Sequence, residues 1–166
     1  MALAIIIMGV SGCGKTSVGL GLSEVLGWPF YDGDDFHPQA NIDKMARGIA
    51  LDDNDRLPWL ERLHALIREH LEGDRSLLVA CSALKANYRD VLKGGREEIL
   101  FVHLEGSFEL VYSRMENRSG HYMKADMLQS QYRDLEPPAD ALTTQIDQPV
   151  DAIITEIIGK LESGSA

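Results

Sequence analysis

The stretch GVSGCGKTS, residues 9–17, matches a phosphate-binding loop at Gly9, Gly14, Lys15 and Thr16, and it directly follows the apolar run LAIIIM of residues 3–8. Its glycines let the main chain wrap closely with N–H groups pointing inward, and a helix expected from Lys15 adds its positive end. Lys15 supplies a positive charge for the β- and γ-phosphates, and the Thr16 hydroxyl can ligate Mg²⁺. A buried strand before the stretch and a helix after it favour a phosphate-binding loop for a nucleoside triphosphate over a plain glycine turn. The residues expected to bind the triphosphate are Gly9, Gly12, Cys13, Gly14, Lys15, Thr16 and Ser17.

The chain as a whole has the composition of one soluble globular domain, residues 1–166. Its formal net charge of -10 argues against nucleic acid or an anionic membrane as the main partner, while local cations can still bind a small anionic substrate. Cys13 and Cys81 have no nearby cysteine partner, which indicates neither a disulfide scaffold nor a zinc site and fits a reducing cytoplasm. The apolar run at residues 3–8 is too short to span a membrane.

Apolar runs alternate with helical patterns along the chain, which predicts an α/β fold with a parallel sheet and helices on both faces. Ligands of such sheets bind at the carboxyl ends of the strands. Pro58 is expected in the first turn of its helix. The polar segment 119–138 breaks the pattern, its middle can form a helix, and we expect it to be a small mobile lid over the ligand edge. The expected strands are residues 3–8, 28–32, 77–81, 99–104 and 143–147, and the expected helices are residues 15–26, 58–71, 86–92, 108–117 and 150–161.

A phosphate loop alone fits a guanine-nucleotide switch, a motor or a kinase. A switch needs a base-reading Asn-Lys-x-Asp segment, which this sequence lacks, and a motor would be longer. The segment YDGDDFHP, residues 31–38, provides what a small kinase needs after its second strand. Asp32 can reach Mg²⁺ through water, and Asp34 can accept the proton of a substrate hydroxyl. An acidic turn is the alternative, but in this context we predict Asp34 and Lys15 as the catalytic residues.

Several cations lie just before an expected helix, after the third expected strand, or in and beside the expected lid. Arg56 can bind a carboxylate in a bidentate fork, or it can pair with one of its neighbours Asp52, Asp53 and Asp55. Arg114 and Arg118 are four residues apart on one helix face, where they can stack on the adenine and reach the phosphates. His121 and Lys124 can touch the acceptor or the γ-phosphate, although a lone loop histidine is usually a surface residue. The residues placed where a substrate anion would lie are Ser82, Lys85 and Arg89.

These segments together resemble the gluconokinase family of P-loop sugar-acid kinases over most of the chain, to about Val150. The matching stretches are IIMGVSGCGKT, DGDDFHP with NIDKM and DNDRLPWL after it, CSALKANYRD, the segment SRMENRSGHYMK and IDQPV. The DGDDFHP block and CSALKANYRD are far more specific than the phosphate loop, which many enzymes share. The resemblance implies transfer of the γ-phosphate of ATP to the 6-hydroxyl of D-gluconate, with Mg²⁺ and often as a homodimer. It also implies that Asp34 and Arg56 face gluconate. Further residues that it places at the ligands are Arg89, His121 and Gln131 for gluconate and Pro149, in IDQPV, for the nucleotide.

Two alternatives stay open at this point. Another small-molecule kinase, such as a shikimate-like kinase, would share the phosphate loop, Asp34 and a carboxylate-binding arginine. The segments CSALK and GHYMK favour gluconokinase, because shikimate kinases have glycine-rich sequence after the third strand. A nucleotide-binding module without turnover is the second alternative, and the combination of Lys15, Thr16, Asp32 and Asp34 argues against it.

Overall fold

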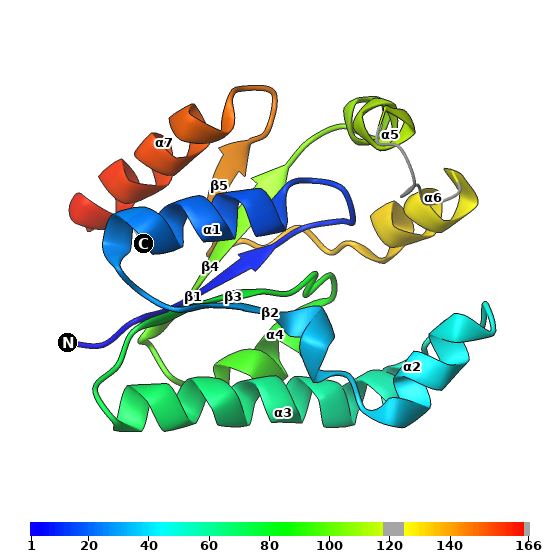
Figure 1. Ribbon diagram of the computed structural model, residues 1–166, viewed down its shortest axis with the longest axis horizontal. Coiled ribbons are helices and arrows are strands. Elements are labelled where there is room, and N and C mark those ends of the chain that lie inside the picture. The colour runs from blue at the N-terminus through cyan, green and yellow to red at the C-terminus, as the bar shows by residue number, and fades with distance from the viewer. Residues whose placement is uncertain (118–124, 165–166) are drawn as a thin grey trace.

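The computed structural model describes residues 1–117 and 125–164, and its centre is a five-stranded sheet in which all neighbouring strands are parallel. Figure 1 shows the strands side by side with helices above and below them. Each expected strand is present within two residues of its expected ends, which confirms the predicted sheet. In spatial order the strands are β2 (Phe30–Asp32), β3 (Leu77–Ala80), β1 (Ala4–Met8), β4 (Ile99–Glu105) and β5 (Leu142–Gln145).

Strand β1 lies in the middle of the sheet because its side chains are apolar on both faces. All five of its residues are buried. Ile5 and Ile7 belong to one apolar cluster, and Ala4, Ile6 and Met8 belong to a second cluster. The carboxyl end of β1 therefore delivers the phosphate loop to the centre of the ligand edge.

Helices cover both faces of the sheet, as predicted. In Figure 1, α1 (Lys15–Leu26) and α7 (Val150–Glu162) lie above the sheet, and α3 (Asp53–Glu72) and α4 (Ala86–Lys93) lie below it. The remaining elements stand beyond the carboxyl ends of the strands, at the right of the view. They are the 3₁₀ helix η1 (Gly33–Phe36) and the helices α2 (Gln39–Ala46), α5 (Phe108–Glu116) and α6 (Ala125–Asp134).

The start of α3 corrects one prediction. The helix begins at Asp53 rather than at Pro58, so that Pro58 lies in the second turn and not in the first. A capping box sets the earlier start: Asp52 Oδ1 accepts from Asp55 N at 2.8 Å, and Asp55 Oδ2 accepts from Asp52 N at 3.0 Å. Because proline has no N–H, the helix lacks its usual hydrogen bond to the carbonyl of Asn54.

The expected lid is described in part. Its residues 125–134 form α6, which confirms the helix expected in its middle. Arg118, His121 and Lys124 lie outside the described residues. Among the described residues, none of the helices is both long enough and apolar enough to cross a membrane.

Candidate active site

The phosphate loop has the left-handed backbone that its glycines predict. Gly12 has φ 81° and Gly14 has φ 100°, and a Cβ on Gly12 would lie 2.7 Å from Met115 Cγ. The helix α1 begins directly after Gly14, so its free N–H groups face the loop. Lys15 Nζ folds over the loop and donates to Gly9 O at 3.0 Å and to Val10 O at 2.9 Å. The loop thus forms an anion-binding cradle with its cation in place, and Thr16 and Ser17 are exposed at its rim.

Two neighbouring segments hold the loop. Ser82, directly after β3, accepts from Gly9 N through its carbonyl at 3.2 Å. Gln131 of α6 makes two hydrogen bonds with Ser11: its Oε1 accepts from the Ser11 main-chain N at 2.8 Å, and its Nε2 donates to the Ser11 hydroxyl at 3.0 Å. The helix of the expected lid is therefore attached to the phosphate loop. A contact of Gln131 with the acceptor stays a prediction.

The acidic turn after β2 holds two carboxylates in different environments. Asp32 caps η1, because its Oδ1 accepts from Asp34 N at 3.0 Å. The Asp34 side chain is 84% exposed at the mouth of the site. Although the side chain is largely exposed, nearby protein atoms still remove part of its solvation and raise the pKa of Asp34; the Asp32 charge raises it further, and the Lys15 charge opposes both. Asp34 and Lys15 therefore share one electrostatic environment across the site.

A rigid support lies beneath this turn. Trp59 of α3 donates its indole N–H to Gly33 O at 2.8 Å, and the His37 ring stacks on Trp59 with centroids 4.2 Å apart. Asn41 Nδ2 contacts both His37 Nδ1 at 3.1 Å and Asp55 O at 2.9 Å. Burial lowers the pKa of His37, so the ring is neutral at neutral pH. These contacts fix the acidic turn to α2 and α3.

Arg56 lies within α3, and its partner is a tyrosine. Its Nη1 donates to the Tyr88 hydroxyl at 2.9 Å, and its Cζ lies 5.5 Å from the centroid of the Tyr88 ring. Asp55 pairs instead with Lys44 at 2.7 Å. In the part of the chain that the structure describes, Arg56 forms no ion pair with Asp52, Asp53 or Asp55. Its guanidinium therefore keeps its charge available for a bound anion.

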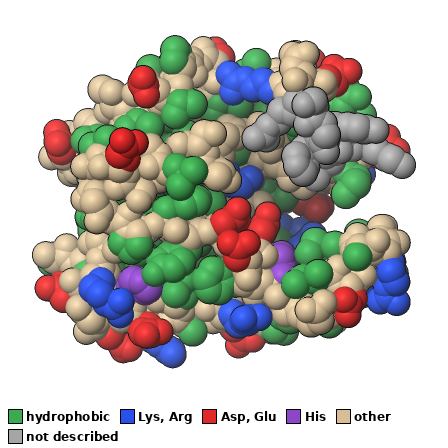
Figure 2. Space-filling view, in the orientation of Figure 1, with side chains coloured by type: hydrophobic (Ala, Val, Ile, Leu, Met, Phe, Trp, Pro, Cys, Tyr) green, Lys and Arg blue, Asp and Glu red, His purple; other side chains and the backbone are tan. Residues whose placement is uncertain are grey.

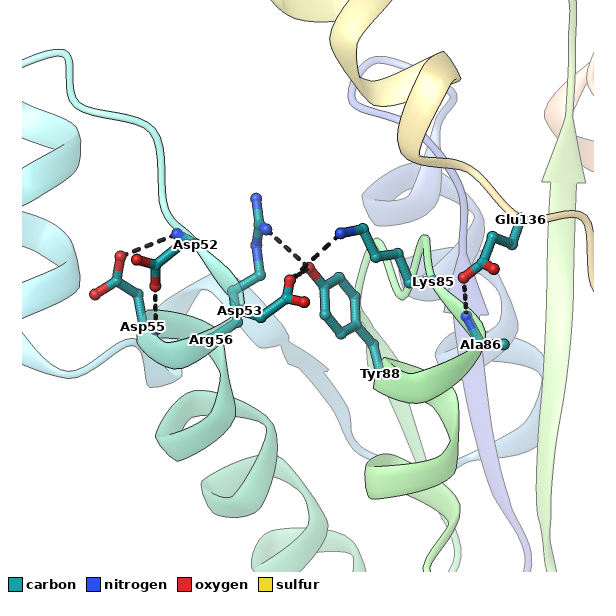
Figure 3. Close-up of polar contacts among 8 residues, drawn as sticks. All are labelled: Asp52, Asp53, Asp55, Arg56, Lys85, Ala86, Tyr88 and Glu136. Carbon is teal, nitrogen blue, oxygen red and sulfur yellow. Dashed lines mark hydrogen bonds and ion pairs between the residues drawn. The ribbon is translucent and has the colours of Figure 1, made fainter.

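Lys85 and Arg89 flank Tyr88 on the chain and have different surroundings. Lys85 Nζ lies 3.4 Å from Asp53 Oδ1 in the group of side chains drawn in Figure 3. The buried Arg89 turns away toward three main-chain carbonyls: Nη1 donates to Ala83 O at 2.7 Å and Leu84 O at 3.1 Å, and Nη2 donates to Glu136 O at 2.8 Å. Arg89 thus joins the loop after β3 to the segment after α6. Direct contact of Arg89 with a substrate stays a prediction.

The residues expected at the nucleotide lie on the other side of the loop. Arg114 of α5 donates to Ile146 O at 2.6 Å, close to Pro149, which caps α7. Burial raises the pKa of the Cys13 thiol, and the charges of Lys15 and Arg114 oppose this rise. Arg114, the phosphate loop and the chain around Pro149 therefore lie on one side of the site.

The surface is hollowed between these two sides. Figure 2 shows a notch between the α2 and α3 layer below and the upper part of the molecule, with acidic and basic side chains at its edges. A separate cavity of ≈ 370 Å³ lies behind the phosphate loop, at the ends of β4 and β5. It is lined by Val10, His103 and Tyr132 among others, and by none of the residues predicted for the acceptor. The residues predicted for the acceptor therefore lie outside this cavity, and we expect the acceptor to bind at the notch, which we call the acceptor groove.

Known proteins with similar sequences identify the family. A family model described as shikimate kinase matches residues 11–161. A probable gluconokinase of Mus musculus is 42% identical over 92% of this chain and 92% of its own length. The thermoresistant gluconokinase of Escherichia coli K12 is 39% identical over 96% of this chain and 93% of its own length. The chain belongs to the gluconokinase family.

Solved structures agree with this membership. A gluconokinase from Sinorhizobium meliloti 1021 superimposes with a TM-score of 0.86 at 41% identity, over 97% of this chain and 92% of that one. The shikimate kinase of Aquifex aeolicus, at 19% identity and a TM-score of 0.65 over 98% of each chain, shares the fold alone. The chain thus has the P-loop kinase fold and is a kinase of the gluconokinase family.

The predicted residues of this gluconokinase-family site leave out two that the structure brings into it, Tyr88 and Asp53. Tyr88 occurs in the segment KANYRD between two cations that the sequence analysis did single out, Lys85 and Arg89. Lys85 is the N-cap residue of α4 and Tyr88 follows three residues later, so the two side chains lie on one face of the helix. This spacing is the sequence signal that could have placed Tyr88 in the site. The contact with Arg56 spans 32 residues of sequence, which local patterns do not reveal.

Proposed function

We propose that this protein transfers the γ-phosphate of ATP to the 6-hydroxyl of D-gluconate, giving 6-phospho-D-gluconate and ADP. The observation that supports this most is the division of charge in the groove. Asp34, after β2, feels the charge of Lys15, while Arg56 and Lys85 gather around Tyr88 at the start of α3 and α4. Gluconate has a hydroxyl at one end and a carboxylate at the other, which suits such a site. The relatives named gluconokinase are, by that name, kinases of gluconate, which supports this acceptor.

The reaction follows from the positions of these groups. The 6-hydroxyl oxygen of gluconate attacks the γ-phosphorus, the bond from that phosphorus to the β–γ bridging oxygen breaks, and ADP leaves. Asp34 accepts the hydroxyl proton and orients the attacking oxygen. Lys15 and the main-chain N–H groups of the loop stabilise charge on the transferring phosphoryl group. Arg56 and Lys85 hold the carboxylate of gluconate, which fixes the far end of the substrate.

Magnesium fits this arrangement. Thr16 and Asp32 are the residues that would hold it, because a hydroxyl and a carboxylate are ligands that Mg²⁺ accepts. Among the described residues, no group of three His, Cys, Asp or Glu side chains is placed to hold a metal, so the phosphates and water would complete the shell. When bound, Mg²⁺ would neutralise charge that develops on the phosphates. We also propose a cytoplasmic location and a homodimer. Light scattering, which measures the molar mass in solution, tests the homodimer.

A coupled assay for ADP release tests the function. The panel contains gluconate, its epimers and shikimate, with ATP and Mg²⁺. We expect turnover with gluconate and little or none with shikimate; the reverse would assign a shikimate-like kinase, and ATP binding without ADP release on any acceptor would assign a binding module. Lys15→Ala should lose most turnover. Lys160→Ala is the matched control, because Lys160 Nζ also donates to a main-chain carbonyl, that of Thr143 at 2.9 Å, away from the phosphate loop.

A further inference from the structure

Tyr88 connects the cations of the acceptor groove to one carboxylate. It is 5% exposed on α4, and its hydroxyl lies between Arg56 and Asp53 of α3. The hydroxyl oxygen is 2.9 Å from Arg56 Nη1 and 2.5 Å from Asp53 Oδ1. Figure 3 shows Arg56 and Asp53 of α3 meeting this oxygen, while Lys85, at the N-cap of α4, reaches Asp53. A single buried side chain thus holds groups that lie far apart in the sequence.

The direction of these hydrogen bonds is fixed by the number of protons. A tyrosine hydroxyl has one proton, and here it is donated to the Asp53 carboxylate, which can only accept. The same oxygen must then accept from Arg56, whose guanidinium can only donate. Burial and the hydrogen bond to Asp53 raise the pKa of Tyr88, so the hydroxyl keeps its proton at neutral pH. Asp53 therefore orients the hydroxyl, and the hydroxyl orients Arg56.

The ring of Tyr88 adds a second constraint. Arg56 Cζ lies 5.5 Å and Lys85 Nζ lies 5.6 Å from its centroid, within the range of cation–π attraction. The other acids at the start of α3 have partners of their own, since Asp52 and Asp55 cap the helix and Asp55 also pairs with Lys44. Lys85 pairs with Asp53 and is also acted on by Asp134, while Arg56 has no ion pair among the described residues, so Arg56 is the cation that suits a single substrate carboxylate.

We propose that Tyr88 is a positioning residue for substrate binding, which holds the Arg56 guanidinium, through the hydrogen bond that Asp53 orients, in the geometry that receives the carboxylate of the sugar acid. The proposal rests on the proposed function. It assigns to Tyr88 a role in the affinity for the acceptor and none in the transfer of the phosphoryl group.

Tyr88→Phe isolates the hydroxyl, because the ring and its contacts with both cations remain. We expect the KM for gluconate to rise about tenfold, since a hydrogen bond to a charged group is lost, with kcat and the KM for ATP within about twofold of wild type. Tyr31→Phe is the matched control: it also loses a tyrosine hydroxyl bond, to His70 Nε2 at 3.0 Å, at the opposite end of α3. Its KM for gluconate should not change. An unchanged KM in Tyr88→Phe, or an equal rise in Tyr31→Phe, would overturn the proposal.

A double-mutant cycle shows whether Tyr88 acts through Arg56. Arg56→Ala alone should raise the KM for gluconate and leave ATP affinity unchanged. In that background Tyr88→Phe should have little further effect, because there is no guanidinium left to position. Additive effects would mean that the hydroxyl acts elsewhere. The Asp53 side chain is 55% exposed, so Asp53→Ala should not prevent folding. It should raise the KM for gluconate, because it removes the acceptor of the Tyr88 proton; an unchanged KM would exclude Asp53 from the role.

The wild-type enzyme separates this proposal from the proposed function. If the wild type phosphorylates a different carboxylated acceptor, the function fails, and the same cycle is run with that acceptor. The positioning role of Tyr88 is then tested by the ratio of the KM of Tyr88→Phe to the KM of the wild type for that acceptor.

Discussion

Single residues of the same type differ in role here because their surroundings differ. Asp32 and Asp34 are two positions apart, yet Asp32 is tied to the turn while Asp34 is left exposed at the mouth of the site. The raised pKa of Asp34 means that its carboxylate is less favoured in the folded protein than in the unfolded chain. Because a raised pKa favours the protonated form, such a carboxylate is suited to accept a proton during the reaction.

Asp34→Asn should therefore lower kcat by about 10²- to 10⁴-fold, because the amide cannot accept the hydroxyl proton. ATP binding should be kept, since Asp34 lies outside the phosphate loop. Steady-state kinetics and nucleotide titration measure both. Asp35→Asn, the neighbouring exposed acid, is the control and should keep near-normal turnover. Near-normal turnover of Asp34→Asn would remove Asp34 as the base.

The pH dependence gives the same residue a second test. Only the carboxylate form of Asp34 can act as a base, and its pKa is raised above 3.8. Activity should consequently fall on the acid side at a higher pH than for an ordinary aspartate. Above that pH the folded protein bears a cost for the charged form, which is small because solvent screens a side chain that is 84% exposed, so Asp34→Asn should slightly raise the free energy of unfolding at pH 7. Denaturant unfolding at pH 7 measures this; a less stable variant would contradict the assigned environment.

At the scale of elements, α6 is coupled to the phosphate loop by hydrogen bonds. Gln131 is the residue of α6 that contacts Ser11 at both its main chain and its hydroxyl, so the position of the helix and the shape of the loop depend on each other. Gln131→Ala should raise the KM for ATP several-fold, as expected for two lost hydrogen bonds, with a smaller effect on gluconate. Gln145→Ala, which loses a bond to Glu105 on the surface, is the control. A change confined to gluconate would show that Gln131 serves the acceptor instead.

The helix α3 contains a proline whose cost can be measured. Pro58 lies in the second turn, is exposed and leaves the Asn54 carbonyl without its helical donor. Pro58→Ala should raise the free energy of unfolding by about 1–3 kcal/mol. Proline in a helix interior costs about 3 kcal/mol relative to alanine, and part of this gain is offset because the unfolded chain with proline has less entropy to lose on folding. Urea unfolding measures the change. Pro38→Ala, at the N-cap of α2 where no N–H is required, should give no such gain; equal stability of Pro58→Ala and wild type would refute the cost.

For the molecule as a whole, the sequence was sufficient to predict those parts of the fold that depend on local residue patterns. The run at β1 and the glycine loop after it predict a buried strand and an anion site by themselves, and the sheet follows from the alternation. The helix α2 was not predicted, because Ile42 and Met45 are exposed and its buried residue is Asn41, which leaves no apolar stripe to read. The link from Arg56 to Tyr88 was not predicted either, because it depends on how α3 and α4 pack together.

The two apolar clusters should unfold as one unit, since the central strand belongs to both. Ile6 and Ile7 are fully buried and point to opposite faces of β1, toward the α3 side and the α1 side. Ile6→Ala and Ile7→Ala should each lower the free energy of unfolding by about 2–5 kcal/mol through lost burial and a cavity. Ile42→Ala, exposed on α2, should change it by about 0.5 kcal/mol or less. Because each face is held by the same strand, both core variants should unfold in one cooperative transition that coincides by fluorescence and circular dichroism. Two separate transitions in either variant would mean that each face of the sheet is stable without the other.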